Sequence, residues 1–148
     1  MRVYLGLDLG TSAVKALLAG EDGTVVASGR APCRVDVPAP GRAEAQPEEW
    51  LAAAHVAVRD ALAQAGSCDV VAIGFSGQMH GVVLCDEQGG PVRPAILWAD
   101  ARAAAEAERW ERAGNPPAPG FAGPIVAWLA AHEPESLRRA RWALQPKD

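Results

Sequence analysis

The chain has 148 residues, and its 14 Lys and Arg against 18 Asp and Glu give a formal net charge of −4, which argues against a nucleic-acid binder. Its 49% hydrophobic and 22% charged residues are typical of an ordinary globular domain and exclude disorder over the whole chain. No apolar run approaches the roughly 20 residues of a membrane span, and no signal peptide or anchor is expected. The three cysteines lack C-x-x-C spacing, which argues against a disulfide framework or a zinc site and favours a reducing, cytoplasmic setting.

The first 28 residues carry the pattern of three short strands. Apolar and polar residues alternate from Val3 to Leu9, which is the period of a strand with one buried face. A turn at residues 10–12 leads to a second apolar run, Ala13–Ala19. The Asp22-Gly23 pair is a strong hairpin signal before a third strand over Thr24–Ser28. The pattern predicts a three-stranded antiparallel meander.

A loop and a helix follow the meander. Residues Val35–Gln46 include two prolines and a glycine and show no periodicity, which predicts a loop. Pro47 suits the first position of a helix, and Gly66 suits its C-terminal cap. Apolar residues recur between them at helical spacing, and we expect this stripe to lie on the sheet: Leu51, Ala54, Val58 and Leu62.

The second half of the chain mixes strands and helices. Asp69–Phe75 is a continuous apolar run, expected in the interior of a sheet, and Gly81–Cys85 is a second strand after a polar turn. The remaining elements are predicted as an Asp86–Gly90 turn, an extended Pro91–Trp98 segment, helices over Ala101–Ala113, Pro124–Ala131 and Pro134–Ala140, and an extended Arg141–Leu144 segment.

This order of elements predicts an α/β domain with a ribonuclease H-like mixed sheet and flanking helices. The first three strands are expected to be antiparallel, and the fourth to join them across a helix. The sheet is expected to be incomplete, because the last apolar strand ends at residues 145–148 with nothing after it to cover it.

The first motif that could carry chemistry is the run from Asp8 to Ser12, followed by Lys15. A carboxylate at the end of a strand can hold a magnesium ion, and a glycine turn with two hydroxyls offers donors to phosphate oxygens. The alternative is a turn that only closes a hairpin beside a solvated Asp8. Neither a Walker loop nor a G-x-G-x-x-G segment occurs in the chain.

The second motif, Gly77-Gln78-Met79-His80-Gly81, combines an amide, a thioether and an imidazole. Gln78 and His80 can donate and accept hydrogen bonds while Met79 packs on a carbon face, which suits a polyol. A lone histidine in a turn is, alternatively, a structural residue.

The third motif contains Trp98, Asp100 and Arg102. Trp98 could form an apolar wall against sugar C–H bonds, with the two charged side chains supplying hydrogen bonds. Alternatively, Asp100 caps a helix and Arg102 pairs with Glu106 four residues on.

In this order and spacing, the three motifs resemble the FGGY carbohydrate kinases, and among them the xylulokinases. Val3–Lys15 is similar to the first phosphate motif of that family, Ser76–Gly81 to its G-Q-M-H-G segment, and Pro94–Arg102 to the block that follows. Three further stretches also resemble family segments, so that the resemblance covers nearly the whole chain: Pro119–Pro124, His132–Glu135 and Leu144–Asp148.

The resemblance implies an actin-like ATPase fold and ATP-dependent phosphorylation of a ketopentose, such as D-xylulose to its 5-phosphate, with Mg²⁺ as cofactor. Asp8 would be the catalytic residue that holds the metal and the phosphates. The residues implied to bind the phosphates of ATP are Gly10, Thr11, Ser12 and Lys15. The residues implied to bind the sugar are Gln78, Met79, His80, Trp98, Asp100 and Arg102.

The resemblance also places the general base and a second domain beyond residue 148. Residues 1–148 are therefore expected to be a truncated N-terminal, sugar-binding-side domain without the C-terminal domain, and not competent for catalysis alone. The alternatives are a non-catalytic sugar-binding or regulatory module, a degenerate kinase remnant, or another actin-like ATPase. The expected partners are the sugar and ATP, with no nucleic acid or membrane, and a homo-oligomer stays open.

Overall fold

The structure, a computed structural model, describes residues 1–110 and 117–148. The chain folds into two compact units. Unit 1 contains Met1–Arg34, Glu48–Gln78 and Lys147, and unit 2 contains Val35–Pro47, Met79–Pro146 and Asp148. The first predicted motif therefore lies in unit 1, whereas His80 and Trp98 lie in unit 2.

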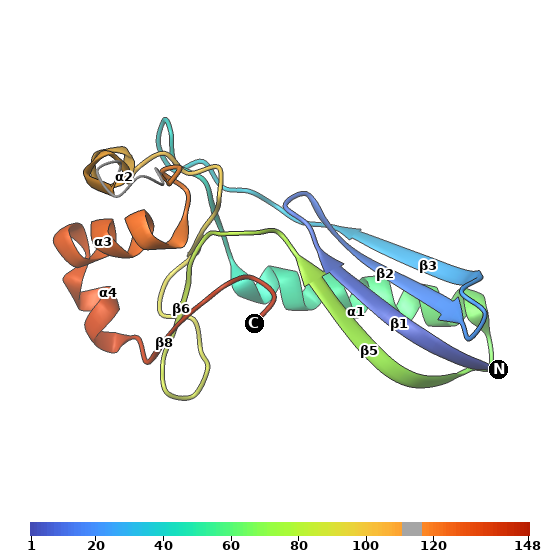
Figure 1. Ribbon diagram of the computed structural model, residues 1–148. Helices are drawn as coiled ribbons and strands as arrows, with labels where there is room; N and C mark the ends of the chain where they lie inside the picture. The colour runs from blue at the N-terminus through green and yellow to red at the C-terminus, as the bar shows by residue number, and fades with distance from the viewer. Residues whose placement is uncertain (111–116) are drawn as a thin grey trace. The chain divides into compact units, whose positions relative to one another are not determined.

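Unit 1 is built on a four-stranded mixed sheet with the order β3-β2-β1-β5 (Figure 1). Its strands are β1 (Arg2–Leu9), β2 (Ala13–Gly20), β3 (Val25–Pro32) and β5 (Asp69–Gly77). The first three pair antiparallel, and β5 pairs parallel to β1 after the chain has passed through a helix. This topology confirms the predicted meander and its fourth strand.

Helix α1 (Pro47–Ala65) covers one face of this sheet (Figure 1). It begins and ends as predicted, with Gly66 in the left-handed region at φ 70°. The predicted apolar stripe is confirmed in part, because Ala54, Val58 and Leu62 are half-buried and pack against the core of unit 1. The alanines one position before each of these residues are the ones buried most deeply against the sheet. Its buried residues are Trp50, Ala53, Ala57 and Ala61, whereas Leu51 is 65% exposed.

Gly29 in β3 explains this choice of helix face. A Cβ atom at Gly29 would lie 1.9 Å from the carbonyl oxygen of Ala57, so the helix backbone rests almost directly on the strand. Large side chains on that face would hold the helix off the sheet. The core of unit 1 fills the space around this contact with Val3, Leu5, Val14, Ala16, Leu18, Ala27 and Ala31 from the strands.

Strand β5 is more exposed than its apolar sequence predicts. It pairs only with β1 among the described strands, and Ile73 and Phe75 are 54% and 62% exposed. The prediction of an interior strand is therefore wrong within the described part of the chain, because α1 makes its close approach at β3 and no further strand lies beyond β5.

Unit 2 consists of short strands and helices. Its elements are β4 (Glu44–Ala45) paired with β7 (Ala95–Ile96), β6 (Val83–Cys85) paired with β8 (Trp142–Leu144), α2 (Ala104–Trp110), α3 (Ala122–His132) and α4 (Pro134–Arg139). They surround a core of Val82, Leu84, Ile96, Ala103, Ile125, Trp128 and Leu129. Among the described residues of the whole chain, no helix combines the length and apolar character that a membrane crossing requires.

Three predictions for unit 2 need correction or fall outside the structure. The segment predicted as a loop over Val35–Gln46 contains β4. This strand forms by pairing with β7, and no local sequence pattern indicates it. The strand predicted over Gly81–Cys85 is shorter and pairs with β8. The predicted Ala101 start of a helix moves to Ala104, and its predicted end at Ala113 lies outside the described residues.

Candidate functional site

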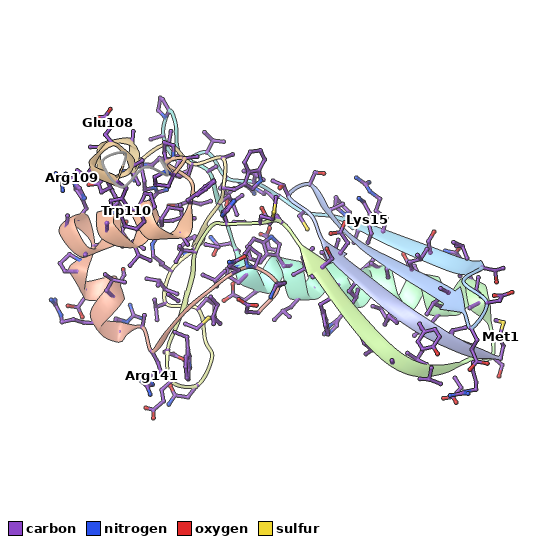
Figure 2. The ribbon with its side chains drawn as sticks, viewed as in Figure 1. Met1, Lys15, Glu108, Arg109, Trp110 and Arg141 are labelled. Atoms are coloured by element: carbon purple, nitrogen blue, oxygen red, sulfur yellow. The ribbon has the colours of Figure 1, made fainter. Side chains whose placement is uncertain are left out.

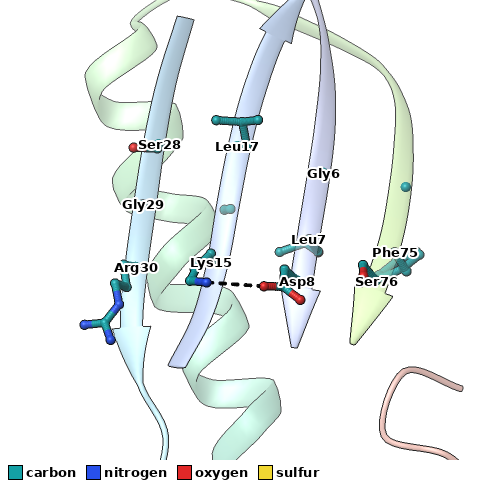
Figure 3. Close-up of a pocket in the computed structure, with 12 residues that line it drawn as sticks. Gly6, Leu7, Asp8, Lys15, Leu17, Ser28, Gly29, Arg30, Phe75 and Ser76 are labelled. Carbon is teal, nitrogen blue, oxygen red and sulfur yellow. Dashed lines mark hydrogen bonds and ion pairs between the residues drawn. The ribbon is translucent and has the colours of Figure 1, made fainter. Parts of the chain in front are cut away.

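The first candidate cluster lies where β1 ends and β2 begins. Asp8 and Lys15 face each other across these antiparallel strands, with Lys15 Nζ 3.5 Å from Asp8 Oδ2 (Figure 3). Their neighbours Val14 and Ala16 are buried against α1, so the pair lies on the opposite face of the sheet. The side chains of Asp8 and Lys15 are 44% and 61% exposed, which leaves both charges open to a ligand.

A concavity of about 600 Å³ surrounds this pair. Gly6 and Gly74 contribute no side chains to it, and Arg30 on β3 is the register partner of Lys15 on β2 (Figure 3). Lys15 extends away from its strand (Figure 2). The surface therefore combines two cationic side chains with one carboxylate, a set of charges that suits an anionic ligand and one metal ion.

The turn after β1 is tied to the end of β5. Gly10 donates its N–H to the Ala13 carbonyl at 3.1 Å, which closes the turn. The Thr11 hydroxyl donates to Gln78 Oε1 at 3.2 Å, and the Gln78 N–H donates to the Leu9 carbonyl at 2.8 Å. Ser12 is exposed. The structure thus places Gln78, predicted on the sugar side, in contact with the first motif.

The second candidate cluster centres on His80 in unit 2. His80 has φ 61°, and Gly81 after it has φ 71°. A non-glycine residue in this left-handed region costs on the order of 1–3 kcal/mol and persists where its surroundings enforce it. The imidazole of His80 stacks on the Phe121 ring, with centroids 3.7 Å apart and planes 13° from parallel.

Two glycines bring the Trp98 segment to the same place. A Cβ atom at Gly81 would lie 2.7 Å from the Ile96 carbonyl oxygen, and one at Gly120 would lie 1.8 Å from the Trp98 carbonyl oxygen. Gly81 also donates its N–H to the Gly120 carbonyl at 3.3 Å. Three backbone segments thus converge.

The side chains at this convergence are accessible. Met79 is 72% exposed, Trp98 is 52% exposed, and His80 is half-buried. Phe121 received no role from the sequence, although it lies in a segment that resembles the family; its stacking on His80 depends on a contact between distant parts of the chain.

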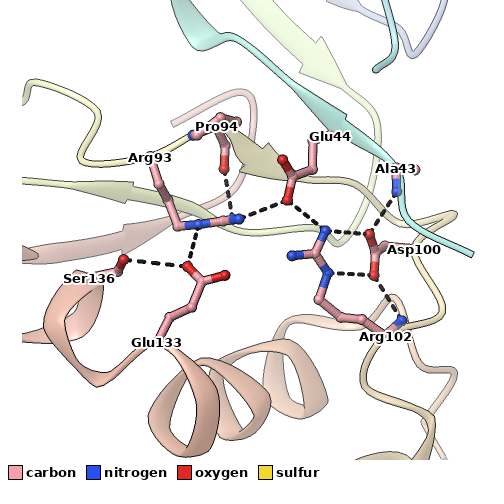
Figure 4. Close-up of polar contacts among 8 residues, drawn as sticks. All are labelled: Ala43, Glu44, Arg93, Pro94, Asp100, Arg102, Glu133 and Ser136. Carbon is pink, nitrogen blue, oxygen red and sulfur yellow. Dashed lines mark hydrogen bonds and ion pairs between the residues drawn. The ribbon is translucent and has the colours of Figure 1, made fainter. Parts of the chain in front are cut away.

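Asp100 and Arg102 lie in a buried ion-pair network of unit 2 (Figure 4). Arg102 donates from Nε and Nη2 to the Asp100 carboxylate, each at 2.8 Å, and from Nη2 to Glu44 Oε1 at 2.6 Å. The Ala43 N–H donates to Asp100 Oδ2 at 2.7 Å. The side chains of Asp100 and Arg102 are 0% and 2% exposed.

A second arginine extends the network. Arg93 contacts Glu44 at 2.7 Å and Glu133 at 2.9 Å. The guanidinium of Arg102 also lies over the Trp128 ring, 5.1 Å from its centroid. These contacts favour the structural interpretation of Arg102, with Asp100 and Glu44 in place of the expected partner Glu106.

The network keeps both of its central residues charged. Burial alone would raise the pKa of Asp100, but the hydrogen bonds from Arg102 and from the Ala43 N–H outweigh it and hold that pKa below its ordinary value. Burial likewise opposes the charge on Arg102, and its hydrogen bonds to Asp100 and Glu44 raise its pKa. The pair is therefore a charged, buried structural unit at neutral pH, in which Arg102 Nε and Nη2 are hydrogen-bonded and the buried Nη1 has no hydrogen-bond partner among the described residues.

Comparisons with known proteins give relatives that match nearly the whole length of this chain. The chain is 42% identical to the xylulose kinase of Escherichia coli (strain K12), with 99% of this chain and 32% of that protein covered. The chain thus spans about a third of the length of the curated relatives that it matches.

Solved structures match as well. The xyloylose kinase from Brucella ovis superposes with a TM-score of 0.92 at 38% identity, covering 99% of this chain and 32% of that one. The xylulose kinase from Rhodospirillum rubrum gives a TM-score of 0.91 at 27% identity, covering 98% and 32%. These likenesses confirm the predicted ribonuclease H-like, actin-like ATPase fold class. Residues 3–148 match the model of the N-terminal domain of the FGGY family of carbohydrate kinases, and the chain belongs to that family.

Proposed function

We propose that this chain supplies the sugar side and the phosphate-facing turn of an ATP-dependent kinase that converts D-xylulose to D-xylulose 5-phosphate. The observation that carries the proposal is the solvent-open Asp8–Lys15 pair at the glycine turn. The names of the relatives support the choice of sugar, since the one with 42% identity and the one with a TM-score of 0.92 are called xylulose kinase and xyloylose kinase.

On the phosphate side, this chain contributes a cation, a carboxylate and a tight turn. Lys15 neutralises phosphate charge, and Gly10 lets the backbone of the turn approach the phosphate oxygens without a side chain in between. Ser12 adds an exposed hydroxyl beside it. In phosphoryl transfer, this positioning and charge neutralisation supply most of the catalysis.

Asp8 is the residue that would hold Mg²⁺. One or two carboxylates together with substrate phosphates are the usual ligands of Mg²⁺ in kinases, so a single open carboxylate beside a phosphate-facing turn fits the ion. When bound, the ion neutralises charge on the transferred phosphoryl group.

On the sugar side, each residue has a distinct chemical task. The ring nitrogens of His80 can accept from and donate to sugar hydroxyls, while Trp98 and Met79 offer exposed apolar surface to the carbon skeleton. Asp100 and Arg102 act on this side through structure: their network fixes the backbone immediately after Trp98.

Turnover requires the acceptor, the metal and the phosphoryl group to be held together in one closed site. The relatives are about three times as long as the part of them that this chain matches. We therefore propose that residues 1–148 alone bind D-xylulose without phosphorylating it.

A chimera tests the proposed reaction. The matching third of the Escherichia coli xylulose kinase is replaced with this chain, and ADP release is measured with D-xylulose and with glycerol. We expect the chimera to phosphorylate D-xylulose and the same chimera carrying Asp8→Ala to lose this activity. A folded, ATP-binding chimera that does not phosphorylate D-xylulose would contradict the proposal. Calorimetric titration of the 148-residue chain with D-xylulose separates sugar binding from turnover.

A further inference from the structure

We propose that Phe121 is a positioning residue, whose ring holds the His80 imidazole in the orientation that a sugar hydroxyl meets. This inference rests on the proposed function, because it concerns the same sugar site. Its starting point is the stacked pair, with ring centroids 3.7 Å apart and planes 13° from parallel.

The stacking leaves the reactive edge of the imidazole free. The hydrogen-bonding groups of a histidine lie in the plane of its ring, so a partner on the ring face blocks rotation without occupying either nitrogen. Phe121 offers no hydrogen bond of its own. The stacking therefore fixes a direction for the His80 ring while engaging neither of its nitrogens.

The backbone on both sides of the stack is held firmly. His80 is fixed by its left-handed conformation and by the Gly81 N–H, which bonds to Gly120, the residue before Phe121. Phe121 is the N-cap residue of α3, and its carbonyl accepts from the Ile125 N–H at 3.1 Å. Ile125 is fully buried, so α3 anchors the phenyl ring to the core of unit 2.

Phe121 does not serve mainly as a core residue. It is half-buried and is not among the buried side chains that form the core cluster of unit 2. Its ring contact is with a histidine whose neighbours Met79 and Trp98 are exposed. A phenyl ring at the margin of the core, packed flat on an accessible imidazole, fits a role in orienting that imidazole.

The test uses the 148-residue chain with isotope-labelled histidine. NMR signals of the His80 ring are assigned by their loss in His80→Ala, and D-xylulose is titrated into wild type, Phe121→Leu and Phe121→Tyr. We expect Phe121→Leu to remove the ring-current shift of His80 and to weaken sugar binding about threefold to tenfold. Phe121→Tyr keeps a stacking ring and should preserve both.

A double mutant and a matched control sharpen the result. Phe121→Leu combined with His80→Ala should bind D-xylulose no more weakly than His80→Ala alone, because Phe121 acts only through His80. The chain contains a second stacked pair, Trp128 and His132, with centroids 4.6 Å apart. His132→Ala should leave the sugar affinity unchanged.

Each contrary outcome identifies what has failed. Sugar binding that is equally strong in wild type and Phe121→Leu, or fully additive losses in the double mutant, would overturn the role of Phe121 and leave the proposed function standing. A wild-type chain that shows the His80 ring-current shift but binds no D-xylulose would instead remove the proposed sugar site, and the positioning role with it.

Discussion

The Asp8–Lys15 pair of unit 1 and the Asp100–Arg102 pair of unit 2 combine the same types of charge in opposite surroundings. The first pair is 44% and 61% exposed and meets at a single distance of 3.5 Å. The second is 0% and 2% exposed, and two hydrogen bonds of 2.8 Å join the guanidinium to the carboxylate. An exposed pair contributes about 0–1 kcal/mol to stability, whereas losing one member of a buried pair costs about 3–5 kcal/mol.

The difference shows which charges a ligand can use. Asp8 and Lys15 lose little when they exchange each other for a metal ion or a phosphate, because water already competes for both. Asp100 and Arg102 would have to leave a network that also holds Glu44 and the Ala43 N–H. The motifs look alike in sequence, but one pair is available for chemistry and the other maintains the loop that carries Trp98.

The largest effect should come from Arg102→Met. It removes the guanidinium and leaves Asp100 buried without a cationic partner, while Glu44 keeps Arg93, so we expect a loss of about 3–5 kcal/mol in the free energy of unfolding. Urea denaturation measures it. The matched control is Arg2→Met, since Arg2 pairs with Glu21 at 2.8 Å while 61% exposed. Similar losses in both variants would contradict the comparison.

Asp8→Ala should affect turnover rather than stability. In the chimeric kinase we expect kcat to fall about 100-fold, because the carboxylate acts on the metal and the phosphoryl group, while the Kd for D-xylulose stays within about twofold. Steady-state kinetics and sugar titration separate the two effects. Unchanged kcat would remove Asp8 from the mechanism.

A change of pH should distinguish Asp100 from its neutral analogue. Because the folded-state pKa of Asp100 lies below its ordinary value, its charge contributes stability above about pH 4, the unfolded value, and that contribution is lost as the pH falls through the folded-state pKa. The stability advantage of wild type over Asp100→Asn should therefore be constant at neutral pH and shrink in acid. If the stability difference between wild type and Asp100→Asn stays the same at every acidic pH at which the protein remains folded, Asp100 does not stabilise the fold through its charge.

The smallest effect on stability should come from Lys15→Met. The expected change in the free energy of unfolding is within about 1 kcal/mol, because the ion pair is exposed and screened by salt. The same variant should bind ATP more weakly in the chimera. A large loss of stability would place Lys15 with Arg102 as a structural charge.

Local patterns predicted the meander and helix α1 because alternation, the Asp22-Gly23 turn and the Pro47 and Gly66 signals act over a few residues. The line of deepest burial on the helix, Ala53, Ala57 and Ala61, was not predictable, since it depends on the contact with Gly29, which lies far from the helix in sequence. The contact between Glu44 and Arg102 spans 58 positions, and no spacing rule indicates it. The motifs identified the candidate residues, but only the fold separated exposed charges from buried ones.

The close approach of Gly29 to the backbone of Ala57 restricts which residues position 29 can accept. Any side chain at position 29 meets the helix backbone, which cannot move without uncovering Ala53 and Ala61 together. A methyl group placed on Gly74 would have no heavy atom of the described residues within 4 Å apart from its chain neighbours, so that position carries no such constraint. In a saturation library selected for folded protein, position 29 should therefore retain glycine alone, while position 74 should accept several small residues. We expect sequence variation in this sheet to concentrate on β5, the strand farthest from the contact between β3 and the helix.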